Sequence, residues 1–140
     1  MIDITKDKFW NMLNEPEPII ERYPNGIKSY RWYNEKSELH RDNDLPADIW
    51  YHEDGSIYRK LWYQNHKLHR DDGPAIIWSY SNGSIEEERW HQNGEIHRIG
   101  GPAVIWYHID GSINLGEWYL YGKEYDKKRY KQILRRWGCD

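Results

Sequence analysis

The chain has 140 residues, a net charge of −3 and a single cysteine, so it is one domain long and cannot form an internal disulfide or a thiolate zinc cluster. Nine tryptophans and twelve tyrosines exclude a disordered chain, since disordered segments are poor in aromatic residues. The sequence has neither an apolar run of the roughly 20 residues needed to span a bilayer nor a basic-then-apolar leader. We therefore expect a cytoplasmic protein with a core built of rings.

Residues 1–18 are predicted to cap the N-terminal end of the domain. Phe9, Trp10 and Leu13 fall on one face of a short helix over residues 5–14. The Pro-containing stretch at residues 15–18 would end that helix.

Residues 19–125 are predicted to form a domain of repeats with a period of 28 residues. The series that keep this period are Trp62, Trp90 and Trp118; Trp50, Trp78 and Trp106; Pro46, Pro74 and Pro102; and Asp54-Gly55, Asn82-Gly83 and Asp110-Gly111. A period of this size marks small units that bury their faces only against one another. Such a stack is typical of a binding surface rather than of a catalyst.

A short hairpin is predicted in each unit, with a tryptophan opposite a histidine. Asn93-Gly94 favours a two-residue type I′ turn, which fixes this pairing. In the first unit, a three-residue loop at residues 35–37 would absorb the extra residue and preserve the pairing. The predicted pairs are Trp32 with His40, Trp62 with His69, and Trp90 with His97.

Longer strands are predicted after each hairpin. Proline donates no backbone hydrogen bond and belongs at a strand start, which favours strands at residues 75–80 and 103–107. The result is an antiparallel meander of about seven strands that begins with a partial unit at residues 19–32. Ile76 and Ile77 point to opposite faces, so we expect a single twisted sheet with apolar groups on both sides.

Residues 126–140 are predicted to form a capping helix. Asp126 would cap its start, Gly138 would end it, and an apolar stripe would dock on the last hairpin. The stripe consists of Tyr130, Ile133, Leu134 and Trp137. The helix also carries a local charge of +4 from Lys127, Lys128, Arg129, Lys131, Arg135 and Arg136 against two aspartates.

The string Trp-x-x-Asn-Gly-x-x-His, followed by Gly-Pro-Ala and Asp-Gly-Ser, resembles the MORN repeat. The His-Arg-x-x-Gly-Pro-Ala units are closer still to MORN-variant repeat proteins, which look common among phages, large DNA viruses and some bacteria. The similarity covers residues 19–125, although His-Arg replaces the usual His-Gly and the period is longer. It implies an elongated β-meander for protein or lipid attachment, in the cytoplasm of the producing or infected cell.

Catalysis and metal binding are not expected from this chain. Equivalent histidines in successive units would lie two strand spacings apart, roughly 9.5 Å, which is too far for one zinc ion to bridge. The His-Arg-Asp-Asp string at residues 69–72 recurs with changes in the other units, whereas a catalytic group of residues generally occurs once. We therefore expect an Arg–Asp pair within it to hold the connector in place. We predict neither a catalytic residue nor a cofactor.

We predict a non-enzymatic module that binds a partner protein, as an inhibitor, an immunity-type protein or a scaffold. The tryptophans would form a ladder, and an acidic border would suit a basic partner surface. The predicted binding residues are Trp50, Trp62, Trp78, Trp90, Trp106, Tyr63, Tyr107, Arg70 and Arg98.

Other partners remain as alternatives. The module could be a sponge that stacks a small anionic molecule or nucleotide on its rings, or the basic helix could bind anionic lipid. Open edge strands would permit a homodimer. The acidic repeat region argues against nucleic acid, because phosphates would be repelled.

Overall fold

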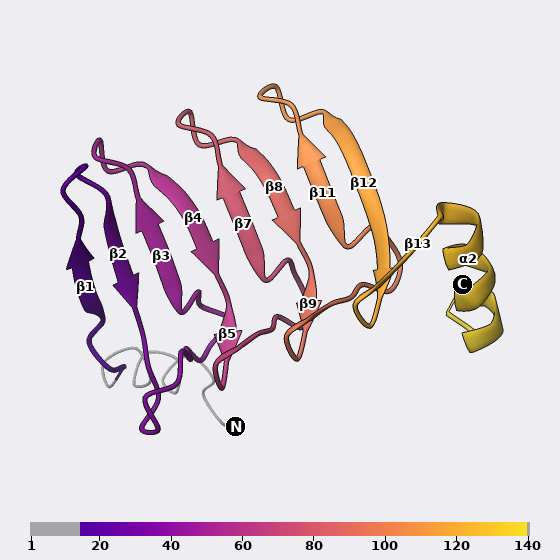
Figure 1. Ribbon diagram of the computed structural model, residues 1–140, viewed down its shortest axis with the longest axis horizontal. Coiled ribbons are helices and arrows are strands. Elements are labelled where there is room, and N and C mark those ends of the chain that lie inside the picture. Colours follow the sequence, from indigo (N-terminus) through magenta and orange to yellow (C-terminus); the bar gives the residue numbers. More distant parts are fainter. Residues whose placement is uncertain (1–14, 140) are drawn as a thin grey trace, which may run out of the picture.

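The structure is a computed structural model that describes residues 15–139. Nine strands form one antiparallel sheet in the order β1-β2-β3-β4-β7-β8-β11-β12-β13, followed by a single C-terminal helix (Figure 1). The predicted meander is confirmed. The helix predicted at residues 5–14 lies outside the described residues.

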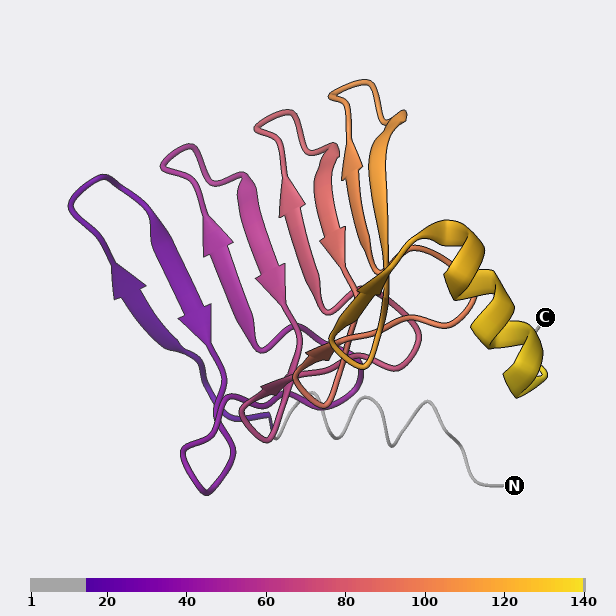
Figure 2. The same cartoon turned by 45° about the vertical axis from the view of Figure 1, so that its right-hand side comes forward.

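Residues 15–139 contain thirteen strands where about seven were expected: nine form the main sheet, and four form two short hairpins outside it. The nine strands of the main sheet are β1 (Ile19–Arg22), β2 (Lys28–Arg31), β3 (Asp48–Tyr51), β4 (Ile57–Leu61), β7 (Ile76–Ser79), β8 (Ile85–Arg89), β11 (Val104–Tyr107), β12 (Ile113–Leu120) and β13 (Lys123–Tyr125). The two separate hairpins are β5 (Tyr63–Gln64) with β6 (Lys67–Leu68), and β9 (His91–Gln92) with β10 (Glu95–Ile96). These short hairpins form a second row along one end of the long strands (Figure 2).

The predicted pairing of tryptophan with histidine is confirmed in all three units. The histidine amide donates to the tryptophan carbonyl in each hairpin. The N···O distances are 3.1 Å for His40–Trp32, 3.1 Å for His69–Trp62 and 3.0 Å for His97–Trp90. The longer first loop also follows the prediction, since Tyr33 bridges Leu39 and Ser37 takes a positive φ of 61°.

Both faces of the sheet bury apolar side chains, as predicted. Ile76 and Val104 are buried on one face, and Ala75 and Ile105 are buried on the other. The strand register also places Trp50, Trp78 and Trp106 in one row across the sheet, on the same face as Ile76.

Helix α2 (Lys127–Trp137) docks on the last hairpin. The Asp126 side chain accepts a hydrogen bond from the Arg129 amide, and Gly138 ends the helix with φ 71°, both as predicted. Tyr130 and Leu134 pack with Leu120 to form a small buried core. Among residues 15–139, no helix has the length and apolar character needed to cross a bilayer.

Trp137 departs from the predicted buried stripe. Its side chain is 48% exposed, and its ring neighbour is Tyr121, 6.2 Å away between centroids and 62% exposed itself. The last helical turn therefore reaches the exposed tip of the β12–β13 hairpin, which cannot cover an indole.

Candidate functional site

Each unit lays an arginine flat on the tryptophan that begins its short hairpin. The distances from guanidinium carbon to indole centroid are 3.6 Å for Arg41 on Trp32, 4.0 Å for Arg70 on Trp62, and 3.7 Å for Arg98 on Trp90. Nη1 of each arginine also donates to the carbonyl of the following proline, at 3.1 Å to Pro46, 3.3 Å to Pro74 and 3.0 Å to Pro102. A planar guanidinium can use its face and its edge at once, and here it does both.

The glycine before proline in the later units makes room for this arginine. A Cβ built on Gly73 would lie 2.8 Å from Cζ of Arg70, and one on Gly101 would lie 3.0 Å from Cζ of Arg98. Close approach of a side chain explains these two glycines, since φ is positive at neither.

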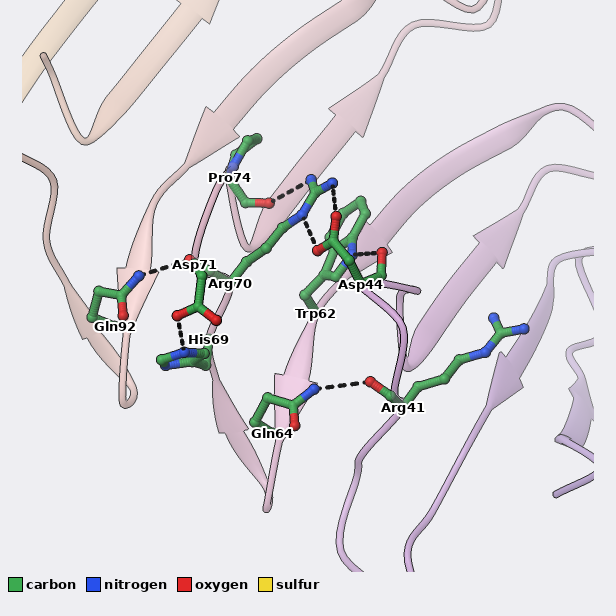
Figure 3. A network of polar contacts seen from close by, with 9 residues as sticks. All are labelled: Arg41, Asp44, Trp62, Gln64, His69, Arg70, Asp71, Pro74 and Gln92. Carbon is green, nitrogen blue, oxygen red and sulfur yellow. Dashed lines mark hydrogen bonds and ion pairs between the residues drawn. The ribbon is translucent and has the colours of Figure 1, made fainter. Parts of the chain in front are cut away.

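The outer edge of the guanidinium binds a carboxylate in the first two units. Arg70 donates from Nε to Oδ1 of Asp44 at 2.7 Å and from Nη2 to Oδ2 at 2.9 Å (Figure 3). Arg41 binds Glu15 in the same bidentate way, with Nη2 3.0 Å from Oε2. In both pairs the acid precedes its arginine by 26 residues. This geometry is the strong form of the arginine–carboxylate bond.

The Arg–Asp pair predicted within residues 69–72 is therefore wrong. The acid comes from the preceding connector, where Asn43 and Asp44 take positive φ values of 61° and 55° and turn the chain toward Arg70. Asp71 instead lies 2.9 Å from Nε2 of His69 (Figure 3).

The histidines join each unit to the next. Nδ1 accepts a hydrogen bond from a backbone amide in the following hairpin turn. The pairs are His40 with Asn65 at 3.1 Å, His69 with Asn93 at 3.0 Å and His97 with Tyr121 at 3.1 Å. An accepting Nδ1 leaves the ring proton on Nε2, which can then donate to the connector aspartates Asp42 and Asp71. His40 and His69 are thus each bonded to the connector that follows them.

Glutamines form a second joint between units. Gln64 donates to the carbonyl of Arg41 at 2.9 Å, and Gln92 donates to that of Arg70 at 2.7 Å (Figure 3). At the C-terminal end the hydroxyl of Tyr130 takes over and donates to the carbonyl of Arg98 at 2.7 Å. Helix α2 therefore supplies the donor to the Arg98 carbonyl that the glutamine of a following repeat supplies elsewhere in the stack.

Trp50, Trp78 and Trp106 lie half-buried in their row, which we call the tryptophan strip. Register places Arg59 between the first two and Glu87 between the last two. The cationic neighbours lie near the rings: the guanidinium carbons of Arg59 and Arg31 are 4.9 and 5.2 Å from the Trp50 centroid, and that of Arg89 is 5.1 Å from Trp78. Tyr23 stacks on Trp50 at 5.3 Å.

The structure divides the predicted binding residues between two places. The strip lies on one face of the main sheet, and Tyr63 of the separate strand β5 lies within electrostatic range of Asp48 and Arg59. The remaining members, Trp62, Trp90, Arg70 and Arg98, form the arginine-covered pockets at the short hairpins. Tyr107 donates to Glu88 at 2.9 Å and lies within electrostatic range of Arg98 in the third unit. Burial, together with that hydrogen bond, raises the pKa of Tyr107 to about 12.

Sequence reasoning missed a buried polar cluster beside Trp50. Asp48 is 6% exposed and Ser29 is fully buried, and neither Oδ1 of Asp48 nor Oγ of Ser29 has a hydrogen-bond partner among the described residues. Burial raises the pKa of Asp48, although Trp50, Arg31 and Arg59 partly oppose the shift. A signal was available, because Asp48 stands where the later units have Ile76 and Val104.

The basic residues of α2 are exposed, and the ammonium of Lys127 lies 5.5 Å from the Trp118 ring centroid. The exposed residues are Lys127, Lys128, Arg129, Lys131, Arg135 and Arg136. Within the described part of the chain, no three His, Cys, Asp or Glu side chains form a group that could hold a metal ion. Comparisons of the chain with protein-family models, with curated proteins and with solved structures gave no match.

Proposed function

We propose that this chain is a MORN-variant repeat module that binds a partner protein without catalysing a reaction, as an inhibitor, an immunity-type protein or a scaffold. The tryptophan strip carries the proposal. Trp50, Trp78 and Trp106 are only half-buried although they lie in the middle of the sheet, and hydrogen-bonded register fixes their spacing. Tryptophan and arginine dominate binding hot spots, and Arg59 lies between two of these rings.

Stacking of a nucleotide on the tryptophans of the short hairpins receives less support, because an arginine already covers each of these rings. Trp62 is only 7% exposed, and Arg70 covers one face of its ring. Trp90 is covered in the same way by Arg98. A base that stacked on these rings would have to displace a guanidinium that is also bonded to a proline carbonyl.

Lipid binding by α2 is a second candidate, favoured by the exposure of Trp137. An exposed indole beside lysines and arginines suits the interface of an anionic membrane. Co-sedimentation with anionic vesicles, abolished by salt and by Trp137→Ala, would support it.

Capture from a lysate of the native host, followed by mass spectrometry, tests the main proposal. The captured protein is then titrated against Trp78→Ala and against Ile77→Ala, which changes the adjacent residue on the opposite face. We expect Trp78→Ala to weaken binding by about 30-fold, as for a hot-spot tryptophan, and Ile77→Ala to weaken it little. Equal affinities for the two variants, or no stoichiometric partner, would reject the proposal.

A further inference from the structure

The pocket of the third unit lacks two interactions that complete the pocket of the second unit. It is a hollow of about 390 Å³, with Trp90, His97, Arg98, Ile99 and Tyr121 among its lining residues. The second-unit pocket, built around Trp62 and Arg70 at equivalent positions, provides an internal comparison within the same molecule.

One residue completes the second pocket through two different groups. The carboxylate of Asp44 binds Nε and Nη2 of Arg70, and the backbone carbonyl of Asp44 accepts from Nε1 of Trp62 at 3.0 Å (Figure 3). An aspartyl residue within a peptide chain is therefore the natural occupant of this kind of pocket.

Neither group has a counterpart in the third pocket among residues 15–139. Arg98 stacks on Trp90 and donates from Nη1 to Pro102, but its Nε and Nη2 meet no acceptor. Nε1 of Trp90 is buried and has no hydrogen-bond partner. A buried donor such as the Trp90 indole N–H is costly unless an acceptor reaches it.

The chain's own acid does not fill the gap. Asp72 precedes Arg98 by the same 26 residues that separate Asp44 from Arg70, but its side chain is exposed and binds no described residue. The connector that carries Asp72 is one residue shorter than the first connector. It also lacks the pair of left-handed residues that turns Asp44 toward its arginine.

We propose that the third pocket binds an aspartate or glutamate presented by a loop of the partner protein. The carboxylate would bind Nε and Nη2 of Arg98, and the carbonyl of the same residue would accept from Nε1 of Trp90. This deepens the proposed function, on which it rests, by naming one chemical feature of the partner.

The surroundings of the pocket suit such a segment. Ile99 replaces the aspartate found at this position in the first two units, so one negative charge is removed from the rim. Ile99 and Tyr121 are 49% and 62% exposed and offer an apolar edge to the residues beside the acid. Asp71 also lines the pocket and pairs with His69, and nearby Glu88 accepts from Tyr107.

A peptide copied from the first connector tests the proposal. The probe is acetyl-Asp-Asn-Asp-Leu-Pro-amide, the sequence of residues 42–46, and the control peptide has Asn in place of its second Asp. Titration is followed by the NMR signals of the Trp90 indole N–H and Arg98 Nε–H in the full chain. We expect saturable shifts with the acidic peptide and affinity at least tenfold weaker for the control peptide.

Variants of the chain sharpen the test. Arg98→Gln should weaken binding at least tenfold, while an unchanged amide spectrum elsewhere shows that the fold is retained. Asp44→Ala removes the carboxylate that binds Arg70 but keeps the backbone carbonyl that accepts from Trp62, so it should create a second carboxylate site reported by the Nε–H signal of Arg70. Asp72→Asn should leave affinity at Arg98 unchanged.

Several results would overturn the inference. These are equal shifts from the neutral peptide, saturation by acetate at the same concentration, or stronger binding to Asp72→Asn, which would mean that the chain fills its own pocket. If the peptide fails while capture of a partner still depends on Trp78, the third pocket is rejected and the proposed function stands. Peptide binding without any captured partner would reject the proposed function instead.

Discussion

At the residue scale, the arginine of each unit makes several contacts at once with neighbouring parts of the chain. Arg70 uses one face on Trp62, one edge on Pro74 and the other edge on Asp44. A small domain with few aliphatic residues gains a rigid junction in this way, because a planar group that bonds in three directions has little freedom left.

Substitution of Arg70 by Lys tests that geometry. The ammonium keeps the charge but cannot bind Asp44 in a bidentate manner or lie flat on Trp62. We expect the free energy of unfolding to fall by about 1–2 kcal/mol in urea titrations, given the partial exposure of the pair. Arg22→Lys on exposed strand β1 is the control, and an equal loss in both variants would contradict the prediction.

Asp48 gives a prediction with the opposite sign. Burial raises its pKa above the usual 3.8, so the fold disfavours the ionised form and wild-type stability falls as pH rises through the folded-state pKa. Asp48→Asn should therefore be more stable than wild type at pH 7, and the advantage should shrink as pH falls through the folded-state pKa toward 3.8.

Thermal unfolding between pH 3 and 7 measures this difference. An Asn variant that is less stable at pH 7 would show that the pairing of Asp48 with Arg31, 3.6 Å away, outweighs burial.

At the element scale, the short hairpins are connected mainly by polar joints. His97 is the last of the three histidine joints, and burial lowers its pKa. A histidine with a lowered folded-state pKa stabilises the fold fully above its unfolded value of 6.5, and this contribution is lost as pH falls below that value. Protonation would also place a proton on the nitrogen that accepts from Tyr121.

His97→Asn isolates this joint, because an amide oxygen can accept in place of Nδ1 and does not titrate. We expect wild type to lose stability between pH 6.5 and 5 more steeply than the variant does, in denaturant titrations. Measurement at pH 8, where His97 is neutral in both states, serves as the reference. Parallel curves over the acid range would disprove a role for His97.

Local pattern predicted the elements well, because each depends on residues that are close in sequence. Asn93-Gly94 determined its hairpin, and Asp126 with Gly138 determined the ends of α2. The joints between units were harder to predict. The bond between Arg70 and Asp44 depends on the backbone turn at Asp44, 26 residues upstream. The placement of Trp62 in a hairpin pocket and of Trp78 in the strip depends on where the chain leaves the main sheet to form the short hairpin.

At the scale of the whole molecule, stability depends on neighbours and on the cap. Tyr130 of α2 accepts from the Gly101 amide at 3.2 Å and donates to the carbonyl of Arg98 at 2.7 Å. The Arg98 carbonyl is the equivalent in the last unit of the Arg41 and Arg70 carbonyls, to which Gln64 and Gln92 donate inside the stack. Repeat stacks need such an end to stay soluble and ordered.

Tyr130→Phe removes only the hydroxyl and keeps the ring. We expect a loss of about 1–3 kcal/mol in the free energy of unfolding, because the part-buried carbonyl of Arg98 loses its side-chain donor. Tyr121→Phe, at an exposed position, should change stability little by the same measurement. A Tyr130 variant as stable as the Tyr121 variant would contradict the capping role.

The histidine joints also have a consequence for length. Because each one spans a single boundary and repeats with the same geometry, deletion of residues 70–97 would rejoin His69 to Arg98 and restore the joint with the turn at Tyr121. The length of the stack can therefore change by whole repeat units while the first hairpin and the C-terminal helix stay the same.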